Sequence, residues 1–462
     1  MLDVEVLLKL IKKTLANGGE YADVFVENRL QTSVVVEDGK LEKIVTGSEA
    51  GAGIRLIHKG KTSYAFSNDL TENALIEAAS AVSSAAVGVP RSPLLDLRKK
   101  RPSADFGIRS FPGDVPMDKK IALVRTADDT ARGLDGRIKQ VTAVYRDSVQ
   151  KVLIASSDGF VAGDERVYTS AFIQVIAVQD AVIQTGYEPV GGLIGFELFE
   201  EQDIREITLK AARRAVMMLT ARKAPGGRMP VVISSRAGGT MIHEAIGHGL
   251  EADLAQQGLS VFSGRLGASV ASGLITVLDD PTLPGKRGSF RFDDEGTPSR
   301  RTVLVENGIL KNYLYDRLSA MKDKASSTGN GRRESYRNRP IPRMSNTFIA
   351  EGGTPPEQIV SSLEKGLLVE KMGGGQVNTV TGDFVFDVQE GYLIEKGMKG
   401  EPVRGATLTG NGPLILKAID MVGNDLGFSI GTCGKDAQGV PVSDAMPTIR
   451  IPEIVVGGAC ES

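Results

Sequence analysis

The sequence has 462 residues, of which 41% are hydrophobic and 24% charged, with a formal net charge of −2. This length favours two or three domains, the composition is typical of a soluble globular protein, and the balance of charge argues against a general nucleic-acid-binding surface. The only two cysteines, Cys433 and Cys460, argue against a disulfide framework and favour a reducing, cytoplasmic compartment. No stretch reaches the roughly 18 apolar residues of a membrane span, so we expect no membrane association.

The first hundred residues predict two helices and a small sheet. Helical spacing of apolar residues predicts a helix over 2–16, stopped by Asn17-Gly18-Gly19, and an Ala-rich helix over 71–87 with Thr71 as its N-cap. Asp38-Gly39 is typical of a hairpin turn. Strands are predicted on both sides of that turn, at 21–28, 33–37 and 51–58.

A polar segment at 98–116 indicates a linker and a sub-boundary within the N-terminal half. Beyond it the pattern predicts helices over 117–132 and 201–223, separated by strands at 140–145, 151–156 and 168–178. Ala224-Pro225-Gly226-Gly227 then breaks the helical pattern sharply. We therefore expect a mixed α/β N-terminal domain over residues 1–224.

The second half is predicted to be rich in strands. Candidate strands lie at 229–234, 274–278, 301–306, 311–315, 383–390 and 391–395. The expected fold is therefore α+β, with a β-rich domain over residues 225–462 that forms an antiparallel sheet or a partial barrel.

The segment His243-Glu244-Ala245-Ile246-Gly247-His248 holds two of the three histidines in the chain. It has the pattern H-E-x-x-x-H, one residue longer than the H-E-x-x-H motif of zinc proteases. Five residues of regular α-helix turn through about 500°, which would splay the two imidazoles by roughly 140°. A local π-turn would absorb the extra residue, and the neighbouring glycines would ease it. We predict a bulged or terminating helix here.

These residue types suit hydrolysis assisted by a metal. Neutral imidazoles bind zinc and leave room for a water, whose pKa the ion lowers while it polarises a carbonyl. Glu244, beside the first imidazole, could act as the general base. The alternative is structural: both histidines are polar residues on a helix, and their hydrogen bonds are made within the fold.

A catalytic zinc site usually has three protein ligands, so a third residue is needed beside the two histidines. The candidates are Cys433, Glu251, Asp253 and His58. Cys433 lies between glycines, and nearby Lys435 would favour its thiolate, whereas the two acids follow the motif closely. Spacing alone leaves the choice between Cys433 and the acids open.

The sequence resembles the TldD/PmbA family of metallopeptidases, in its TldD-type branch. The resemblance rests on ordered motifs between about residues 236 and 442, namely HEAIGHGLEAD, PGKRGSFRFDDEGTPSRRTVLVENGIL, NGRRESYRNRPIPRMSNT, GGGQVNTVTGDFVF, GATLTGNGP and MVGNDLGFSIGTCGKDAQGVPV.

The resemblance implies one zinc ion held by His243, His248 and Cys433, with Glu244 as the catalytic residue. It also implies cleavage of short or unfolded peptides, in a homodimer or in a heterodimer with a PmbA-like subunit that lacks the zinc motif. Mixed histidine and cysteine ligands favour zinc over other divalent ions. The rival interpretation is a non-catalytic protein, in which zinc only stabilises a scaffold that binds peptides or a partner.

Three further segments carry expectations. Gly373-Gly374-Gly375-Gln376 lacks the Lys-Ser/Thr of a phosphate loop; it is either a plain turn or a place where an extended peptide pairs with main chain. The arginines within 332–343 are expected to pair with acids in the fold or across a dimer, or to grip a substrate carboxylate, rather than to bind nucleic acid. Asp293-Asp294-Glu295 is expected to be a solvated loop or a partner for arginine rather than a metal site.

Overall fold

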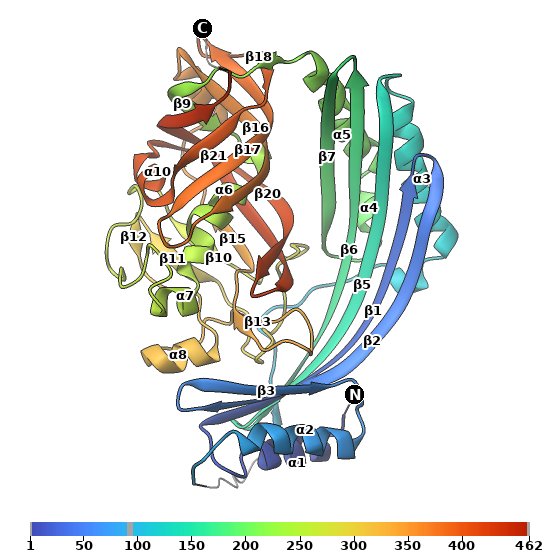
Figure 1. The fold of residues 1–462 in the computed structure, drawn as a ribbon, viewed down its shortest axis with the longest axis vertical. Helices are drawn as coiled ribbons and strands as arrows, with labels where there is room; N and C mark the ends of the chain where they lie inside the picture. Colours follow the sequence, from blue (N-terminus) through green and yellow to red (C-terminus); the bar gives the residue numbers. More distant parts are fainter. Residues whose placement is uncertain (1, 90–95, 460–462) are drawn as a thin grey trace.

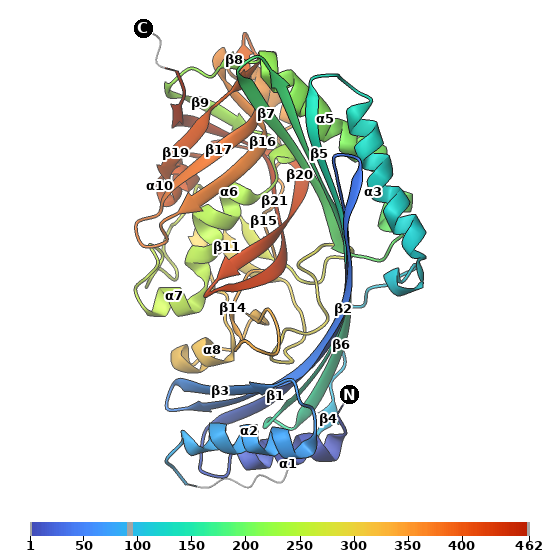
Figure 2. The same cartoon turned by 45° about the vertical axis from the view of Figure 1, so that its right-hand side comes forward.

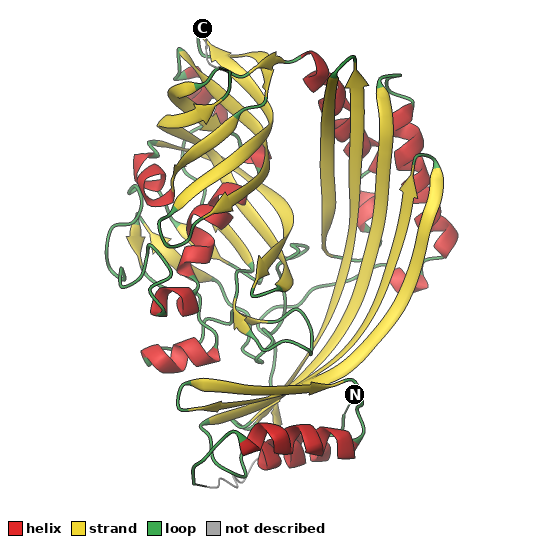
Figure 3. Ribbon diagram, viewed as in Figure 1, coloured by secondary structure: helices red, strands yellow, loops and turns green. Residues whose placement is uncertain are grey.

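The computed structural model describes residues 2–89 and 96–459, so Cys460 lies outside the described residues. Two β-sheets dominate the molecule, one built from residues 21–193 and the other from residues 222–457 (Figures 1 and 3). The N-terminal region mixes helices with its sheet, and the C-terminal region is rich in strands, which confirms the predicted α+β class. Within the described residues no helix is both long and apolar enough to cross a membrane.

The first sheet has seven strands in the order β3-β2-β1-β5-β6-β4, with β7 also paired to β6. Its long members are joined by tight turns, and both Asp38 and Gly39 have positive φ in the predicted hairpin between β1 and β2. The strands are β1 (Tyr21–Glu37), β2 (Lys40–His58), β3 (Lys61–Ser67), β4 (Arg98–Lys99), β5 (Ile138–Ser156), β6 (Phe160–Gln179) and β7 (Val182–Leu193). The predicted strands 140–145 and 151–156 are parts of one continuous strand, β5.

Helices cover one face of this sheet at its two ends (Figure 2). Helices α1 (Val4–Thr14) and α2 (Glu72–Ser84) bury leucines and alanines against one end. Helices α3 (Met117–Arg132) and α5 (Ile204–Thr220) pack on the other end, with the short α4 (Leu198–Glu201) before α5. Each of the four longer helices overlaps the range predicted from its apolar periodicity.

The second sheet has twelve strands and closes a ring. Strand β21 pairs with β9, β9 with β16, β16 with β17, β17 with β19, and β19 again with β21, which makes a partial barrel. The strands are β8 (Arg222–Lys223), β9 (Gly227–Ile233), β10 (Val277–Asp279), β11 (Thr302–Glu306), β12 (Ile309–Leu310), β15 (Asn346–Ile349), β16 (Lys365–Val377), β17 (Asp383–Glu395), β18 (Met398–Arg404), β19 (Thr407–Asn411), β20 (Met421–Lys435) and β21 (Gln438–Gly457); β13 (Gly331–Arg332) and β14 (Ile341–Pro342) pair separately.

Two strand predictions in this half need correction. Residues 311–315 form no strand; Leu314 instead makes an isolated bridge to Glu251, so this apolar segment is a buried loop. Residues 383–390 and 391–395 form one strand, β17. The short helices of this half include α8 (Arg317–Asp323), α9 (Pro356–Ser361) and α10 (Gly412–Ala418).

The other face of the first sheet meets the C-terminal half of the chain. At one end the contact is apolar, because Phe25, Val152 and Ile154 pack against Tyr336. Further along β1 and β5 the same face carries polar side chains such as Arg29 and Gln31. The two halves are therefore joined firmly at one end and face each other across polar side chains beyond it.

Candidate metal centre

The histidine motif occupies an irregular helical segment beside the partial barrel. After η2 (Ser235–Ala237), one short turn of α-helix, α6 (Thr240–Ile242), passes into a π-turn over His243–Gly247 and then a 3-10 turn over His248–Leu250. Helix α7 (Ala252–Gln256) follows. The predicted π-turn is confirmed, and it absorbs the extra residue of the motif.

Small residues let this segment lie close to its neighbours. A Cβ atom added to Gly247 would lie 2.2 Å from the Sδ atom of buried Met344, and one added to Gly239 would lie 2.2 Å from the backbone nitrogen of Ala445. The Gly239 N–H, at the start of α6, donates to the Asp444 carboxylate at 3.1 Å. This buried carboxylate anchors the N-terminus of the motif helix to β21.

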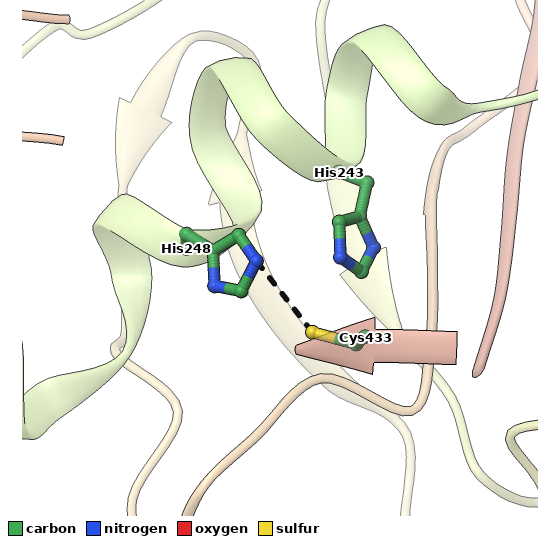
Figure 4. Close-up of side chains that lie close together, drawn as sticks. All are labelled: His243, His248 and Cys433. Atoms are coloured by element: carbon green, nitrogen blue, oxygen red, sulfur yellow. Dashed lines mark hydrogen bonds between the residues drawn. The ribbon is translucent and has the colours of Figure 1, made fainter. Parts of the chain in front are cut away.

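His243, His248 and Cys433 converge (Figure 4). One ligand atom from each lies within 4.8 Å of those of the other two, and the two imidazole centroids are 5.0 Å apart. Cys433 reaches the pair from β20, and its Sγ is 3.5 Å from the His248 Nε2. The structure thus brings two helical residues and one distant strand residue into a single cluster.

The chemistry of this donor set fits a metal ion. His243 and Cys433 are 5% and 3% exposed, and the His243 Nδ1 is buried without a hydrogen-bond partner in the described part of the chain. A buried imidazole nitrogen left unpaired is costly unless something else binds it. Imidazole nitrogens and cysteine thiolates both bind zinc, and mixed sets of three such ligands occur in catalytic zinc sites.

Electrostatics favour the thiolate. Burial raises the pKa of the Cys433 thiol, but the charges and hydrogen bonds of His243 and His248 outweigh burial and hold that pKa well below its usual value. Burial likewise lowers the pKa of His243, and the attraction of Cys433 outweighs it, so the net direction for His243 is upward. The two histidines therefore favour the thiolate, which is the form of the sulfur that binds metals.

The other third-ligand candidates lie outside this cluster. Glu251 is fully buried and accepts from His248 Nδ1 at 3.0 Å, so it contacts the imidazole from the side away from Cys433. Asp253 accepts from Lys435 at 2.6 Å. His58, at the end of β2, lies 3.8 Å from Glu20.

Glu251 is held as an anion by cations around it. Lys435 Nζ lies 3.1 Å from its carboxylate, and Arg343 Nε lies 3.8 Å away. Burial raises the pKa of Glu251, but Lys435, His248 and Arg343 outweigh burial and bring that pKa to about 2. Arg343 also donates to the main-chain carbonyl of Cys433, so one buried arginine connects this carboxylate with the strand that carries the sulfur.

Glu244 follows His243 directly and is half-buried. Burial raises the pKa of its carboxyl, against the charges of His243 and His248. In the described residues its carboxyl has no hydrogen-bond or ion-pair partner, so it is not tied up by a structural role.

The segment Gly373–Gln376 is a bulged part of β16 rather than a plain turn. Gly375 and Gln376 lie opposite Phe386 and Val385 of β17, and the pairing register shifts just before them. On its other side β16 pairs with β9 only at Leu367–Val369, so no described strand covers the second edge of Gly373–Gln376.

Several members of the charged segments noted in the sequence form ion pairs, some buried and some exposed. Asp294 lies 2.7 Å from Arg166 and accepts from the Arg333 N–H at 2.8 Å, while Glu295 lies 2.7 Å from Arg55. The prediction of arginine partners is confirmed for Asp294 and Glu295, and that of a solvated loop is wrong, because these acids are at most 2% exposed. Of the arginines in 332–343, Arg337 pairs with Glu49 at 2.6 Å.

Three contributors to the cluster were not anticipated from the sequence. Asp444 holds the motif helix, Arg343 holds the Cys433 main chain, and Glu251 contacts His248 instead of competing with Cys433 as a ligand. Asp444 and Arg343 are far from the motif in sequence, so no spacing pattern could have indicated them.

Comparison with known proteins covers nearly the whole chain. Three family models match in order: PmbA/TldA metallopeptidase domain 1 at residues 22–86, the central domain at 111–219 and the C-terminal domain at 226–458. The chain is 36% identical to a metalloprotease TldD homolog of Haemophilus influenzae, over 99% of this chain and 97% of that protein.

The chain belongs to the TldD/PmbA family of metallopeptidases.

Other TldD/PmbA relatives extend the likeness. A metalloprotease of Methanothermobacter thermautotrophicus is 35% identical over 95% of this chain and 96% of its own. Among solved structures, TldE from Thermococcus kodakarensis shares the fold with a TM-score of 0.78 at 19% identity, covering 98% of this chain and 99% of that one. A Thermotoga maritima protein described as a candidate modulator of a DNA gyrase has a TM-score of 0.79 at 22% identity, covering 95% of this chain and 96% of that chain.

Proposed function

We propose that this TldD/PmbA protein is a zinc-dependent peptidase, with His243, His248 and Cys433 as zinc ligands and Glu244 as the general base. The observation that carries the proposal is the convergence of three buried donors beside a carboxylate that makes no structural contact. A relative in Saccharolobus solfataricus, 27% identical over 98% of this chain and all of its own, is named a zinc metalloprotease TldD homolog.

A zinc ion bound there would polarise a peptide carbonyl and lower the pKa of a water. The residues of the chain supply the rest. With zinc bound, Glu251 would accept the Nδ1–H of His248, which would leave Nε2 with its lone pair toward the cluster. The Glu244 carboxylate takes a proton from the attacking water and passes it to the leaving amine, a task that its raised pKa suits.

For the substrate, we propose that a short or unfolded peptide lies along the uncovered edge of Gly373–Gln376. Main-chain hydrogen bonds at a strand edge bind peptides with little sequence preference. Side chains of β16 do not obstruct this edge at its centre, because Gly374 has open space where a Cβ would stand.

The rival scaffold function requires a closed site. Structural zinc sites have four protein ligands, whereas catalytic sites have three and an open position. In the described residues the cluster has three members, which supports the peptidase.

The test compares two kinds of variant by zinc content and by hydrolysis of an unfolded casein. Glu244→Gln should keep zinc and lose at least about a hundredfold in kcat, because only proton transfer is removed. His243→Ala should lose both zinc and activity. Hydrolysis at the normal rate by Glu244→Gln would remove Glu244 from its role, and full zinc content in His243→Ala would remove the metal assignment.

The working unit is proposed to be a dimer, either of this chain or with a PmbA-like chain, as the family resemblance implies. Light scattering of the protein alone, and of a mixture with such a chain, measures the mass directly.

A further inference from the structure

A cavity of about 660 Å³ lies between the two halves of the molecule. One wall is the polar face of the first sheet, formed by residues of β1, β2, β5 and β6; the other includes the β20–β21 hairpin, which faces that sheet in Figure 1. The volume is within the range of roughly 300–1,000 Å³ that is typical of ligand sites.

Most carboxylates around this cavity already have cationic partners. Asp147 accepts from Lys120 at 2.7 Å, and Asp294 is paired with Arg166. Glu49 is paired with Arg337. These acids therefore do not balance further positive charge in the cavity.

Three arginines of the lining have no carboxylate partner in the described residues. Arg332 is held by the main-chain carbonyls of Met344 and Pro441, whereas Arg146 and Arg287 lie on opposite walls. Arg146, on β5, is exposed, and its guanidinium lies 5.6 Å from the Phe172 ring. Arg287 donates through Nε to the Gly431 carbonyl at 3.3 Å and lies 5.8 Å from the Tyr168 ring. Across residues 2–89 and 96–459, neither guanidinium forms an ion pair with a carboxylate.

The two guanidiniums also repel each other. Burial lowers the pKa of Arg287, and the charge of Arg146 lowers it further. Like charges facing one cavity without a counter-ion cost free energy, and such unbalanced charge marks a place where an anion binds. An arginine fork matches a carboxylate in two hydrogen bonds.

We propose that Arg146 and Arg287 form a carboxylate-binding site in this cavity, which takes the carboxylate of a peptide. Only the choice of a peptide as the bearer of that carboxylate rests on the proposed function. The wall also contains Glu334, which accepts from the Gly439 N–H at 2.7 Å. Its negative charge disfavours a dianion such as phosphate more than a carboxylate of single charge.

This site is distinct from the metal centre. Thr432 lines the cavity, while its neighbour Cys433 is buried beside the histidines, because successive side chains of β20 point to opposite faces. Binding in the cavity should therefore not require zinc.

The experiment measures binding of fluorescently labelled alanine-based tetrapeptides to the full-length Glu244→Gln protein by fluorescence anisotropy. Peptides with a C-terminal carboxylate or a C-terminal amide form one comparison, and amidated peptides with an internal Glu or Gln form the other. The carboxylate member of at least one pair should bind about tenfold more tightly, as expected for a charge-assisted bond. In Arg287→Gln, and in Arg146→Gln, whose side chain is exposed and safe to change, the preference should fall below about twofold.

The matched control is Arg98→Gln, an exposed arginine elsewhere on the surface, which should keep the preference. Equal binding of both members of each pair, or a preference that survives in Arg146→Gln and Arg287→Gln, would overturn the proposal. Displacement of the carboxylate peptide by inorganic phosphate at lower concentration than by acetate would overturn the ligand class. In Cys433→Ser the preference should persist, so that loss of peptidase activity alone bears on the proposed function and not on this site.

Discussion

Glu251 is the residue on which the orientation of His248 depends. Its carboxylate accepts from His248 Nδ1 and is held in place by Lys435 and Arg343. An outer carboxylate of this kind fixes the ring tautomer and raises the basicity of the other nitrogen.

We expect Glu251→Gln to weaken zinc binding by about 10–100-fold. Competition with a chromophoric chelator measures the affinity, and NMR of ¹⁵N-labelled imidazole reports the tautomer of His248. Asp253→Asn is the matched control, because Asp253 pairs with the same Lys435 but has no contact with His248 in the described structure. Equal losses in both variants would mean that the charge network acts on the fold and not on the imidazole.

At this scale, local sequence indicated part of the site. His243, Glu244 and His248 lie within one short segment, so their chemistry could be predicted before any fold was known. Cys433 could not be separated from Glu251 and Asp253 by spacing, because the choice depends on how β20 approaches the helix. The resemblance to the family, and not the pattern of residues, favoured the sulfur.

At the scale of elements, the π-turn depends on close packing around Gly247. The chain turns back over Met344, whose side chain is fully buried, and a methyl group at position 247 would overlap its sulfur. His248 is the next residue, so any shift that relieves the overlap moves an expected ligand.

We expect Gly247→Ala to lower the free energy of unfolding by about 1–3 kcal/mol, as overpacking does, and to weaken zinc binding. Urea unfolding and chelator competition measure the two effects. Gly434→Ala is the control: it makes the same chemical change beside Cys433, where the added Cβ meets no atom within 4 Å. A stable Gly247→Ala protein with normal zinc affinity would show that the π-turn tolerates a side chain.

Elements with a strong period were predictable, and those set by tertiary contacts were not. Helix α3 was predicted over its observed range because its apolar residues recur at helical spacing. Strand β5 was predicted as two pieces, because its middle is polar where it faces the cavity. Residues 311–315 end in Tyr-Leu-Tyr, residues that favour strands, yet Leu314 instead hydrogen-bonds with the segment that follows His248.

At the scale of the molecule, buried carboxyl groups lie where the two halves meet, and Glu295 contacts Arg55 of β2 there. Burial raises the pKa of Glu295 to about 8 and that of Asp293 to about 6, against ordinary values of 4.5 and 3.8. Between the ordinary pKa and the raised pKa of each group, the folded protein therefore binds more protons than the unfolded chain. The contribution of these two groups to the free energy of unfolding is largest below about pH 4. It is lost as pH rises through 6 for Asp293 and then through 8 for Glu295.

We expect Glu295→Gln to flatten the upper part of this dependence. The unfolding free energy of the natural protein should fall, relative to that of the variant, by on the order of 1 kcal/mol or more between pH 5 and pH 8. Urea titrations at several pH values measure it. Parallel curves for the two proteins over this range would show that Glu295 is already ionised at pH 5 in the folded state.

The first sheet also sets an order on the assembly of the chain. Strand β1 pairs along most of its length with β5, which begins at Ile138, on the order of one hundred residues further along. Until the ribosome has released that later strand, the β1–β2 hairpin presents an open edge whose Val34 and Val36 have no cover. We expect nascent chains that end after β2 and before β5 to pair strands with one another and therefore to aggregate.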